Sequence, residues 1–133
     1  MDTLTRQQRS KLMSRVRSKN TGPEMKVRRL VFSMGFRYRL HVAKLPGKPD
    51  LVFRRKAKVI FVHGCFWHGH DCGRCRIPKT RTEYWMAKIK SNVERDARTQ
   101  FALREAGWSV LILWECMIKD EDALRAKLEN FLQ

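Results

Sequence analysis

The chain has 133 residues, and 29 Lys and Arg against 13 Asp and Glu give it a formal net charge of +16. This length predicts a single domain over residues 1–133, and a hydrophobic content of 43% excludes a disordered basic tail. No apolar run of about 18 residues and no secretory signal is present, so we expect a cytoplasmic protein that does not enter a membrane. A net charge this high favours binding to a polyanion. Nucleic acid is the first candidate, with an anionic membrane surface or an acidic protein as the alternative.

The basic charge is concentrated near the N-terminus. Residues 6–19 contain six Lys and Arg and no acidic residue. Such a run is either a solvated segment or an arm whose cations contact phosphates, with counterion release favouring each contact. Under the second interpretation, residues 1–20 are a DNA-contacting arm.

The first half of the chain predicts one helix and three strands. A capping box at residues 21–24 (TGPE) begins a helix that carries apolar residues at helical spacing and ends near Gly35. Residues 36–40 alternate as in a strand. The stiff turn at 46–49 leads into a strand at 50–53, which we expect to form a hairpin with the apolar run 59–62.

The second half predicts a loop, a long helix, a strand and a last helix. Residues 63–79 are rich in Gly, His and Cys and show no periodicity. A second capping box at 80–83 (TRTE) begins a helix that extends to about Glu105, and residues 108–114 form a nearly continuous apolar strand that we expect to be buried. A terminal amphipathic helix follows. The expected inner face of the long helix comprises Trp85, Ile89, Val93, Ala97 and Phe101. This element order predicts an α/β fold with a mixed sheet.

Cysteine and histidine residues gather in the loop in a pattern typical of a zinc site. In a reducing compartment cysteines serve as metal ligands or free thiols rather than as disulfides, and zinc takes four nitrogen or sulfur ligands in a tetrahedron. A metal would also explain how a loop with so few apolar residues becomes ordered. The candidates exceed four, so the set stays open at this point, and the alternative interpretation of Cys65 or Cys116 is a small buried hydrophobic residue. The candidates are Cys65, His70, Cys72, Cys75 and Cys116.

A second set of residues is suited to phosphodiester chemistry. Asp50 follows Pro49 at the start of a strand, and His63 ends the strand expected to pair with it. A hard cation such as Mg²⁺ needs carboxylate and carbonyl oxygens, and an imidazole at His63 or His68 could act as a general base. Each of these residues also has an ordinary structural interpretation, as a turn aspartate or a core histidine.

Five motifs in order resemble the very-short-patch repair (Vsr) endonucleases, a branch of the restriction-endonuclease-like superfamily. The resemblance covers nearly the whole chain and implies an α-β-β-β-α-β core with a zinc-bound loop and a C-terminal helix. It also implies a DNA nicking endonuclease that cleaves 5′ to the thymine of T:G mismatches left by 5-methylcytosine deamination. The motifs are residues 46–50 (PGKPD), 63–68 (HGCFWH), 80–85 (TRTEYW), 92–96 (NVERD) and 114–116 (WEC).

The resemblance implies specific catalytic residues. Catalytic Mg²⁺ would be held by Asp50 and by the main-chain carbonyl of Val62. The imidazoles near the scissile phosphate fall on His63 and His68, and His68 is the better candidate for the base. The remaining acidic residues of the family site fall on Asp96 and Glu24. An acid-x-Lys element common in the superfamily is replaced here by residues 61–63 (FVH).

The resemblance also implies the zinc ligands and the DNA wedge. Structural zinc would be held by Cys65, His70, Cys72 and Cys116, which leaves Cys75 as an extra cysteine that competes with Cys72 for the assignment. The residues that open the duplex fall on Met13, Phe66, Trp67 and Trp85. The expected partner is double-stranded DNA with a T:G mismatch, and we expect the protein to bind it as a monomer. Mismatch-repair proteins are expected as further partners.

A non-enzymatic zinc-stapled nucleic-acid-binding module is the competing interpretation. It explains the charge, the aromatic residues and the cysteines equally well. It gives no reason for Asp50, His63, His68 and Asp96 to occur together, so we expect an enzyme.

Overall fold

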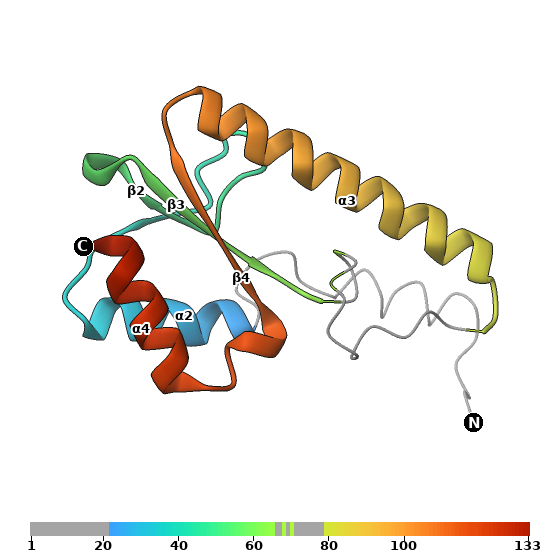
Figure 1. The fold of residues 1–133 in the computed structure, drawn as a ribbon. Helices are drawn as coiled ribbons and strands as arrows, with labels where there is room; N and C mark the ends of the chain where they lie inside the picture. The colour runs from blue at the N-terminus through green and yellow to red at the C-terminus, as the bar shows by residue number, and fades with distance from the viewer. Residues whose placement is uncertain (1–21, 66–67, 69, 71–78) are drawn as a thin grey trace.

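A computed structural model describes residues 22–65, 68, 70 and 79–133 of the chain. Three helices and a four-stranded sheet make up the described part, in the expected order of helix, three strands, helix, strand, helix (Figure 1). The elements are α2 (Gly22–Ser33), β1 (Arg39–Leu40), β2 (Leu51–Phe53), the 3₁₀ turn η1 (Arg54–Lys56), β3 (Lys58–His63), α3 (Thr82–Glu105), β4 (Ser109–Trp114), the 3₁₀ turn η2 (Glu115–Met117) and α4 (Glu121–Leu132). Among these residues no helix is both long and apolar enough to cross a bilayer.

The sheet is mixed, as predicted. Its strands lie in the order β1-β2-β3-β4, with antiparallel pairing from β1 to β3 and parallel pairing between β3 and β4. The expected hairpin is present, with Leu51 opposite Ile60. A parallel neighbour requires a crossover, and α3 supplies it. β1 is shorter than the strand expected at 36–40, because only two of its residues pair with β2.

Helices cover both faces of the sheet, with α2 and α4 on one face and α3 on the other (Figure 1). On β2, Leu51 and Phe53 face α2 and α4, whereas Val52 belongs to the core beneath α3. Alternate side chains of a strand point to opposite faces, so β2 and most of β3 are apolar throughout. Burying side chains of this size contributes about 1.5–3 kcal/mol each.

The inner face of α3 differs from the expected one. Phe101 is 66% exposed and Val93 is also exposed, whereas Leu103 is fully buried. A constant spacing of four residues advances 400° per step and so drifts around a helix of 3.6 residues per turn. The side chains turned toward the protein follow a mixed spacing of three and four: Trp85, Ile89, Asn92, Asp96, Thr99 and Leu103.

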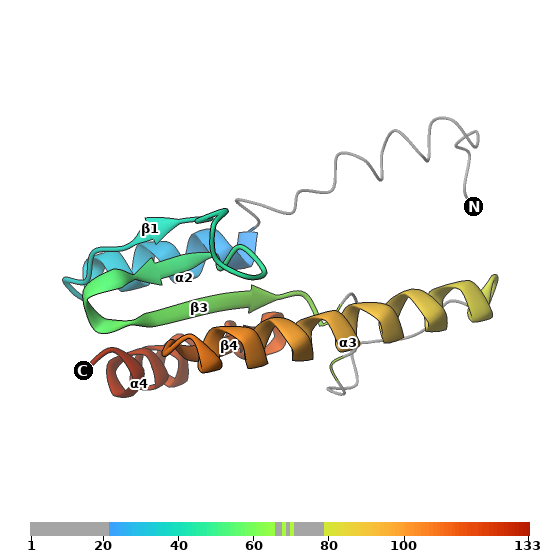
Figure 2. The ribbon, with the colours of Figure 1, turned by 90° about the horizontal axis from the view of Figure 1, so that it is seen from above.

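The N-terminal half of α3 extends past the end of the sheet (Figure 2), which explains why so little of this helix is buried. Its start also differs from the prediction. The helix begins after Arg81, a residue with a left-handed φ of 59°, rather than at a capping box on Thr80. By contrast, α4 is capped conventionally, with the Ala123 N–H donating to the Asp120 side chain at 3.1 Å.

β4 is the edge strand of the described sheet rather than a fully buried one. Leu113 is its one fully buried residue, and the others are half-buried or exposed. β4 pairs with β3 on one side only, so it is less buried than its apolar run predicted. It still carries Trp114 and leads to Cys116, so it brings both residues to the end of β3.

The turn before β2 packs closely against α3. Gly47 has a φ of +73°, and a Cβ built on it would overlap Cγ2 of Thr99 and lie 3.3 Å from the Phe61 ring. Glycine is therefore required here for two reasons, the left-handed backbone and the close approach. The turn leads directly to Pro49, which is buried, and to Asp50.

Candidate active site

Polar side chains from five parts of the chain meet at one end of the sheet. β2 and β3 are antiparallel, so the start of β2, where Asp50 lies, is beside the end of β3, where His63 lies. Glu24 is in the first turn of α2 and His41 directly follows β1. The structure thus brings together residues that are up to 72 positions apart in sequence, Glu24 and Asp96 being the most distant pair.

A carboxylate cluster forms around Asp50. The Val62 N–H donates to Oδ2 of Asp50 at 2.7 Å, which fixes the carboxylate against β3. Glu24 is buried, and its Oε2 lies 3.1 Å from Nε2 of His41 and 3.3 Å from a guanidinium nitrogen of Arg28. His41 Nδ1 lies 3.8 Å from Oδ1 of Asp50. Glu24, His41 and Asp50 offer ligand atoms that all lie within 4.8 Å of one another, so they form a candidate metal site.

The carboxyl group of Asp50 is held in an environment that resists its ionisation. Burial raises the pKa of Asp50 to about 7, and the nearby charge of Glu24 adds to this effect, while the hydrogen bond from Val62 opposes it. A buried carboxylate of this kind gains strongly from a cation, because the cation offsets the cost of burying the negative charge. The donor set therefore fits a divalent ion.

A second cluster consists of two imidazoles and a carboxylate. The rings of His63 and His68 are stacked with centroids 3.8 Å apart and an interplanar angle of 6°. Nδ1 of His68 lies 2.5 Å from Oδ2 of Asp96, which reaches the ring from the middle of α3. A carboxylate on Nδ1 fixes the ring orientation and leaves Nε2 as the nitrogen that can exchange a proton with a substrate.

His63 is the buried member of this pair and is neutral at physiological pH. Burial lowers the pKa of His63 to about 4, and repulsion from His68 acts in the same direction, whereas Asp96 acts against it. Among the described residues, Nδ1 of His63 is buried with no hydrogen-bond partner. Two imidazoles in contact cannot both hold a proton at low cost, so a neutral His63 is compatible with its stacking on the Asp96-bound His68.

A third cluster has the chemistry of a zinc site. Ligand atoms of Cys65, His70 and Cys116 lie within 4.8 Å of one another, and His70 Nδ1 is 3.6 Å from the Cys116 sulfur. Tetrahedral zinc with Zn–S of about 2.3 Å and Zn–N of about 2.05 Å places neighbouring ligands roughly 3.6 Å apart. The three residues therefore fit three of the four ligand positions. Cys72 and Cys75 lie outside the described residues.

Trp114 lies between the cluster of His63, His68 and Asp96 and the candidate zinc cluster, a contact that the sequence did not reveal. Its side chain is stacked on the His70 ring at 4.2 Å and meets the His63 ring edge-on at 5.2 Å. His41 was also not predicted from the sequence. It lies opposite Asp50, and its backbone N–H donates to the Asp50 carbonyl at 3.4 Å. The antiparallel pairing of β1 with β2 is the signal that could have found it.

The structure places most, but not all, of the predicted site residues. It brings Asp50 to Val62 and Glu24, and His63 to His68 and Asp96. Trp85 is half-buried in the first turn of α3, next to the exposed Tyr84. Three residues of the expected wedge, Met13, Phe66 and Trp67, lie outside the described residues, as does the N-terminal arm.

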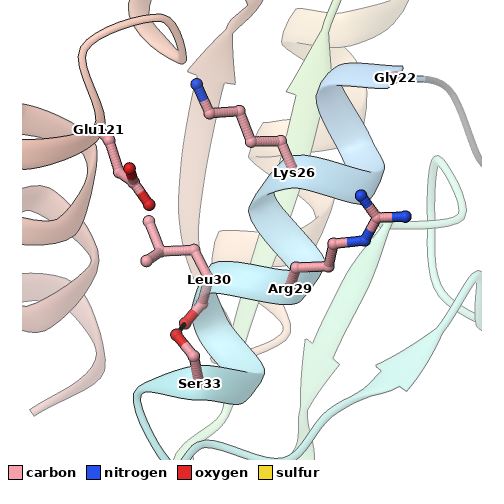
Figure 3. Close-up of a pocket in the computed structure, with 6 residues that line it drawn as sticks. All are labelled: Gly22, Lys26, Arg29, Leu30, Ser33 and Glu121. Carbon is pink, nitrogen blue, oxygen red and sulfur yellow. Dashed lines mark hydrogen bonds between the residues drawn. The ribbon is translucent and has the colours of Figure 1, made fainter.

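A separate depression lies between α2 and the start of α4 (Figure 3). Lys26 and Arg29 from α2 and Glu121 from α4 line it, and it shares no residue with the three clusters. It is therefore not part of the candidate site.

Comparison with known proteins agrees with this geometry. A family model described as DNA mismatch endonuclease Vsr matches residues 1–74. The chain is 50% identical over 131 residues to the type II nicking enzyme V.XorIIP of Xanthomonas oryzae pv. oryzae, an alignment that covers 98% of this chain and 96% of that protein. It is 43% identical over 129 residues to the DNA mismatch endonuclease Vsr of Escherichia coli K12, covering 93% and 83% respectively.

The chain belongs to the DNA mismatch endonuclease Vsr family. The similarity to the type II nicking enzyme V.NmeAIP of Neisseria meningitidis, 40% identical over 99% of this chain and 94% of that one, extends the same conclusion to the C-terminal half. Membership in a Vsr family of DNA endonucleases agrees with the carboxylate and imidazole clusters at the end of β3. It also confirms the family expected from the five sequence motifs.

Proposed function

We propose that this protein nicks double-stranded DNA 5′ to the thymine of T:G mismatches, as in very short patch repair. Family membership supports an endonuclease acting on DNA. The observation that carries the proposal is that two clusters gather at the end of β3. Asp50, a half-buried carboxylate, accepts from the Val62 N–H, and His68, an imidazole bound to Asp96, is stacked on His63. A pure binding module has no use for such a pair, whereas phosphodiester hydrolysis needs both a cation site and a base.

In this proposal Asp50 and the Val62 carbonyl hold a catalytic Mg²⁺. The Val62 N–H already points to Asp50, and in an extended strand the N–H and C=O of one residue point to the same side. The carbonyl of Val62 is thus directed to the side of the strand where Asp50 lies. When bound, Mg²⁺ would neutralise the charge that develops on the phosphate and the leaving oxygen. Glu24 contributes a second buried carboxylate beside Asp50.

His68 is the proposed general base. Asp96 holds the proton on Nδ1 of His68, so Nε2 is free to accept a proton from the attacking water. His63 supports this assignment because, as a neutral ring stacked on His68, it fixes the plane of the base without adding a charge. His68 is also more exposed than His63, so it is the imidazole that a substrate can contact.

Zinc is proposed as the structural metal, with Cys72 completing the set of Cys65, His70 and Cys116. The contact of Trp114 with both His70 and His63 supports a structural purpose, because ordering the zinc loop also orders the imidazole cluster. The zinc-bound loop would carry Phe66 and Trp67 toward the DNA.

DNA binding is proposed to use the exposed cations around the site. Lys44 and Lys48 are exposed in the turn before Asp50, and Arg95 is exposed beside Asp96 on α3. Contacts of such residues with phosphates position a duplex without reading its sequence. The arm at residues 1–20 would add further phosphate contacts, with Met13 reaching the mismatch.

The experiment that tests the proposed function is a nicking assay on a panel of duplexes. The full-length protein with Mg²⁺ should nick the T:G duplex on the strand that carries the thymine, directly 5′ to it. Matched T:A and C:G duplexes of the same flanking sequence serve as controls. Cutting of all duplexes at similar rates would contradict mismatch specificity. Absence of cutting in every duplex would contradict the proposed endonuclease activity.

Replacing Asp96 should disable the base without removing the cation site. We expect Asp96→Asn to lower the single-turnover nicking rate by about 10²-fold or more, because an amide does not stabilise the imidazolium that forms on His68. Glu94→Gln is the matched control, since Glu94 is an exposed acid on the same helix. A rate for Asp96→Asn within two-fold of this control would remove Asp96 from the mechanism.

Replacing the two proposed wedge residues should weaken discrimination. Opening a duplex step costs a few kcal/mol, and base–aromatic stacking returns about 1–3 kcal/mol per base, so insertion succeeds where the step is already weak. The double variant of Phe66→Ala and Trp67→Ala should therefore lose more rate on T:G than on the matched duplex. A ratio of the two rates equal to that of the wild type would assign these aromatic residues to packing.

A further inference from the structure

One residue of the carboxylate cluster has no part in the proposed mechanism. His41 follows β1 with a left-handed φ of 46°, and its imidazole lies between two carboxylates. Nε2 is 3.1 Å from Glu24 and Nδ1 is 3.8 Å from Asp50, with the side chain only 13% exposed. An imidazole at the mouth of an otherwise oxygen-lined site changes which cation that site prefers.

We propose that His41 is a nitrogen ligand of the divalent ion held by Asp50 and Glu24, and that it makes the site favour a transition-metal ion such as Mn²⁺ over Mg²⁺. This inference rests on the proposed function in one respect, that Asp50 holds a metal. It goes further because it adds a ligand and predicts a metal preference.

The spacing of the donor atoms supports a shared ion. An octahedral ion with bonds of about 2.1 Å places neighbouring ligand atoms roughly 3 Å apart and opposite ones roughly 4.2 Å apart. The distance of 3.8 Å from Nδ1 of His41 to Oδ1 of Asp50 falls in this interval, and one ligand atom from each of the three residues lies within 4.8 Å of the other two. One small cation could therefore contact all three side chains.

The backbone fixes His41 in this position. Its N–H donates to the Asp50 carbonyl, so the residue that precedes β2 and the residue that follows β1 are held face to face. Arg28 also contacts the same oxygen of Glu24, at 3.3 Å, and so anchors that carboxylate independently of His41. Holding Glu24 in place is therefore not a task that requires an imidazole.

Ligand chemistry gives the expected preference. Mg²⁺ selects oxygen ligands and gives up its waters reluctantly, whereas imidazole nitrogen binds first-row transition metals more tightly. A site with two carboxylates and one imidazole should bind Mn²⁺ better than the same site with three oxygen ligands. Glutamine at position 41 supplies that comparison, because its amide can still contact Glu24 but offers a metal only an oxygen ligand.

The test measures metal ligation directly in the zinc-loaded, full-length protein. Mn²⁺ is added, its dissociation constant is measured by EPR, and electron spin-echo modulation detects any ¹⁴N bound to it. We expect nitrogen modulation in the wild type and none in His41→Gln. Competition with Mg²⁺ should show that the Mn²⁺/Mg²⁺ affinity ratio falls at least tenfold in this variant.

Matched variants identify the nitrogen. The chain has four histidines, so His63→Gln and His68→Gln should each retain the modulation if His41 is its source. Absence of nitrogen modulation in the wild type, its persistence in His41→Gln, or its loss in either of the other two variants would overturn the proposal. The last two variants keep the test decisive even if His41→Gln does not fold.

Asp50→Asn separates this inference from the function on which it rests. If Mn²⁺ binding is lost in Asp50→Asn but the wild-type ion carries no nitrogen, the Asp50 metal site stands and the assignment of His41 fails. If Mn²⁺ binding is unaffected by Asp50→Asn, both the metal site at Asp50 and the assignment of His41 fail.

Discussion

Asp50→Asn is expected to lower nicking of a T:G duplex by about 10³-fold or more while the Kd for that duplex changes by only a few-fold. Losing a metal-bound carboxylate removes several kcal/mol of transition-state stabilisation, and each 1.36 kcal/mol is a factor of ten in rate. The amide oxygen can still accept the hydrogen bond from Val62, so the fold around it is kept. Binding persists because Lys and Arg contacts with phosphates supply most of it.

A gel assay for nicking and a titration for binding check this result. Glu121→Gln is the matched control, because Glu121 is an exposed acid at the start of α4 that shares no contact with the three clusters. Its rate should equal that of the wild type. Wild-type nicking by Asp50→Asn would remove Asp50 from the mechanism.

The same variant should be more stable than the wild type at alkaline pH. The pKa of Asp50 is raised from 3.8 to about 7, so its protonated form is preferred on folding. The stability that this preference contributes is complete below pH 4 and is lost as the pH rises through 7. Without added Mg²⁺ and with zinc retained, Asp50→Asn should gain roughly 1–4 kcal/mol over the wild type at pH 8 and less at pH 6. Urea unfolding at both pH values measures the difference, and a destabilised variant at pH 8 would contradict the effect of burial.

Cys116→Ala is the variant with the largest expected effect on stability. Cys116 follows β4 and Cys65 follows β3, so zinc would join the loop after one strand to the end of its parallel neighbour. Removing a ligand from a four-ligand zinc site forfeits much of a binding free energy that is also folding free energy. We expect zinc to fall from about one per chain to near zero and the free energy of unfolding to fall by several kcal/mol.

Metal analysis and denaturant unfolding check the zinc prediction, with two further cysteine variants as controls. Cys75→Ala should keep the metal and nearly all of its stability, whereas Cys72→Ala should lose both. The reverse pattern would assign the fourth ligand to Cys75 while leaving the zinc site itself in place. Full zinc in Cys116→Ala would show that this cysteine is only a buried side chain.

Local signals predicted the elements well, and their exposure less well. The capping motif and apolar spacing located α2, and the two short apolar runs at 50–53 and 59–62 located the hairpin of β2 and β3. The buried face of α3 was wrong at Phe101 because only tertiary contacts determine where a long helix leaves the body of the protein. The apolar run of β4 likewise suggested a buried strand, although the burial of a strand depends on its place in the sheet.

Family motifs rather than periodicity predicted most of the candidate site. Asp50, His68 and Asp96 are far apart in sequence, and no local pattern shows that the first lies beside β3 or that the last two touch. His41 belongs to none of the five motifs, and only the pairing of β1 with β2 reveals its position. The positions of residues that meet through long-range contacts are thus the part of the site that a single sequence does not predict.

Gly47 has no role in the proposed reaction, yet we expect its position to tolerate very few substitutions. The turn that carries it touches Thr99, which is less than one helical turn from Asp96, and it ends at Asp50. A side chain at position 47 would overlap the Thr99 side chain, and any shift of α3 that relieved the overlap would move Asp96 away from Asp50, the two carboxylates of the proposed mechanism. In a library of random variants selected for repair, position 47 should accept as few replacements as the catalytic residues themselves.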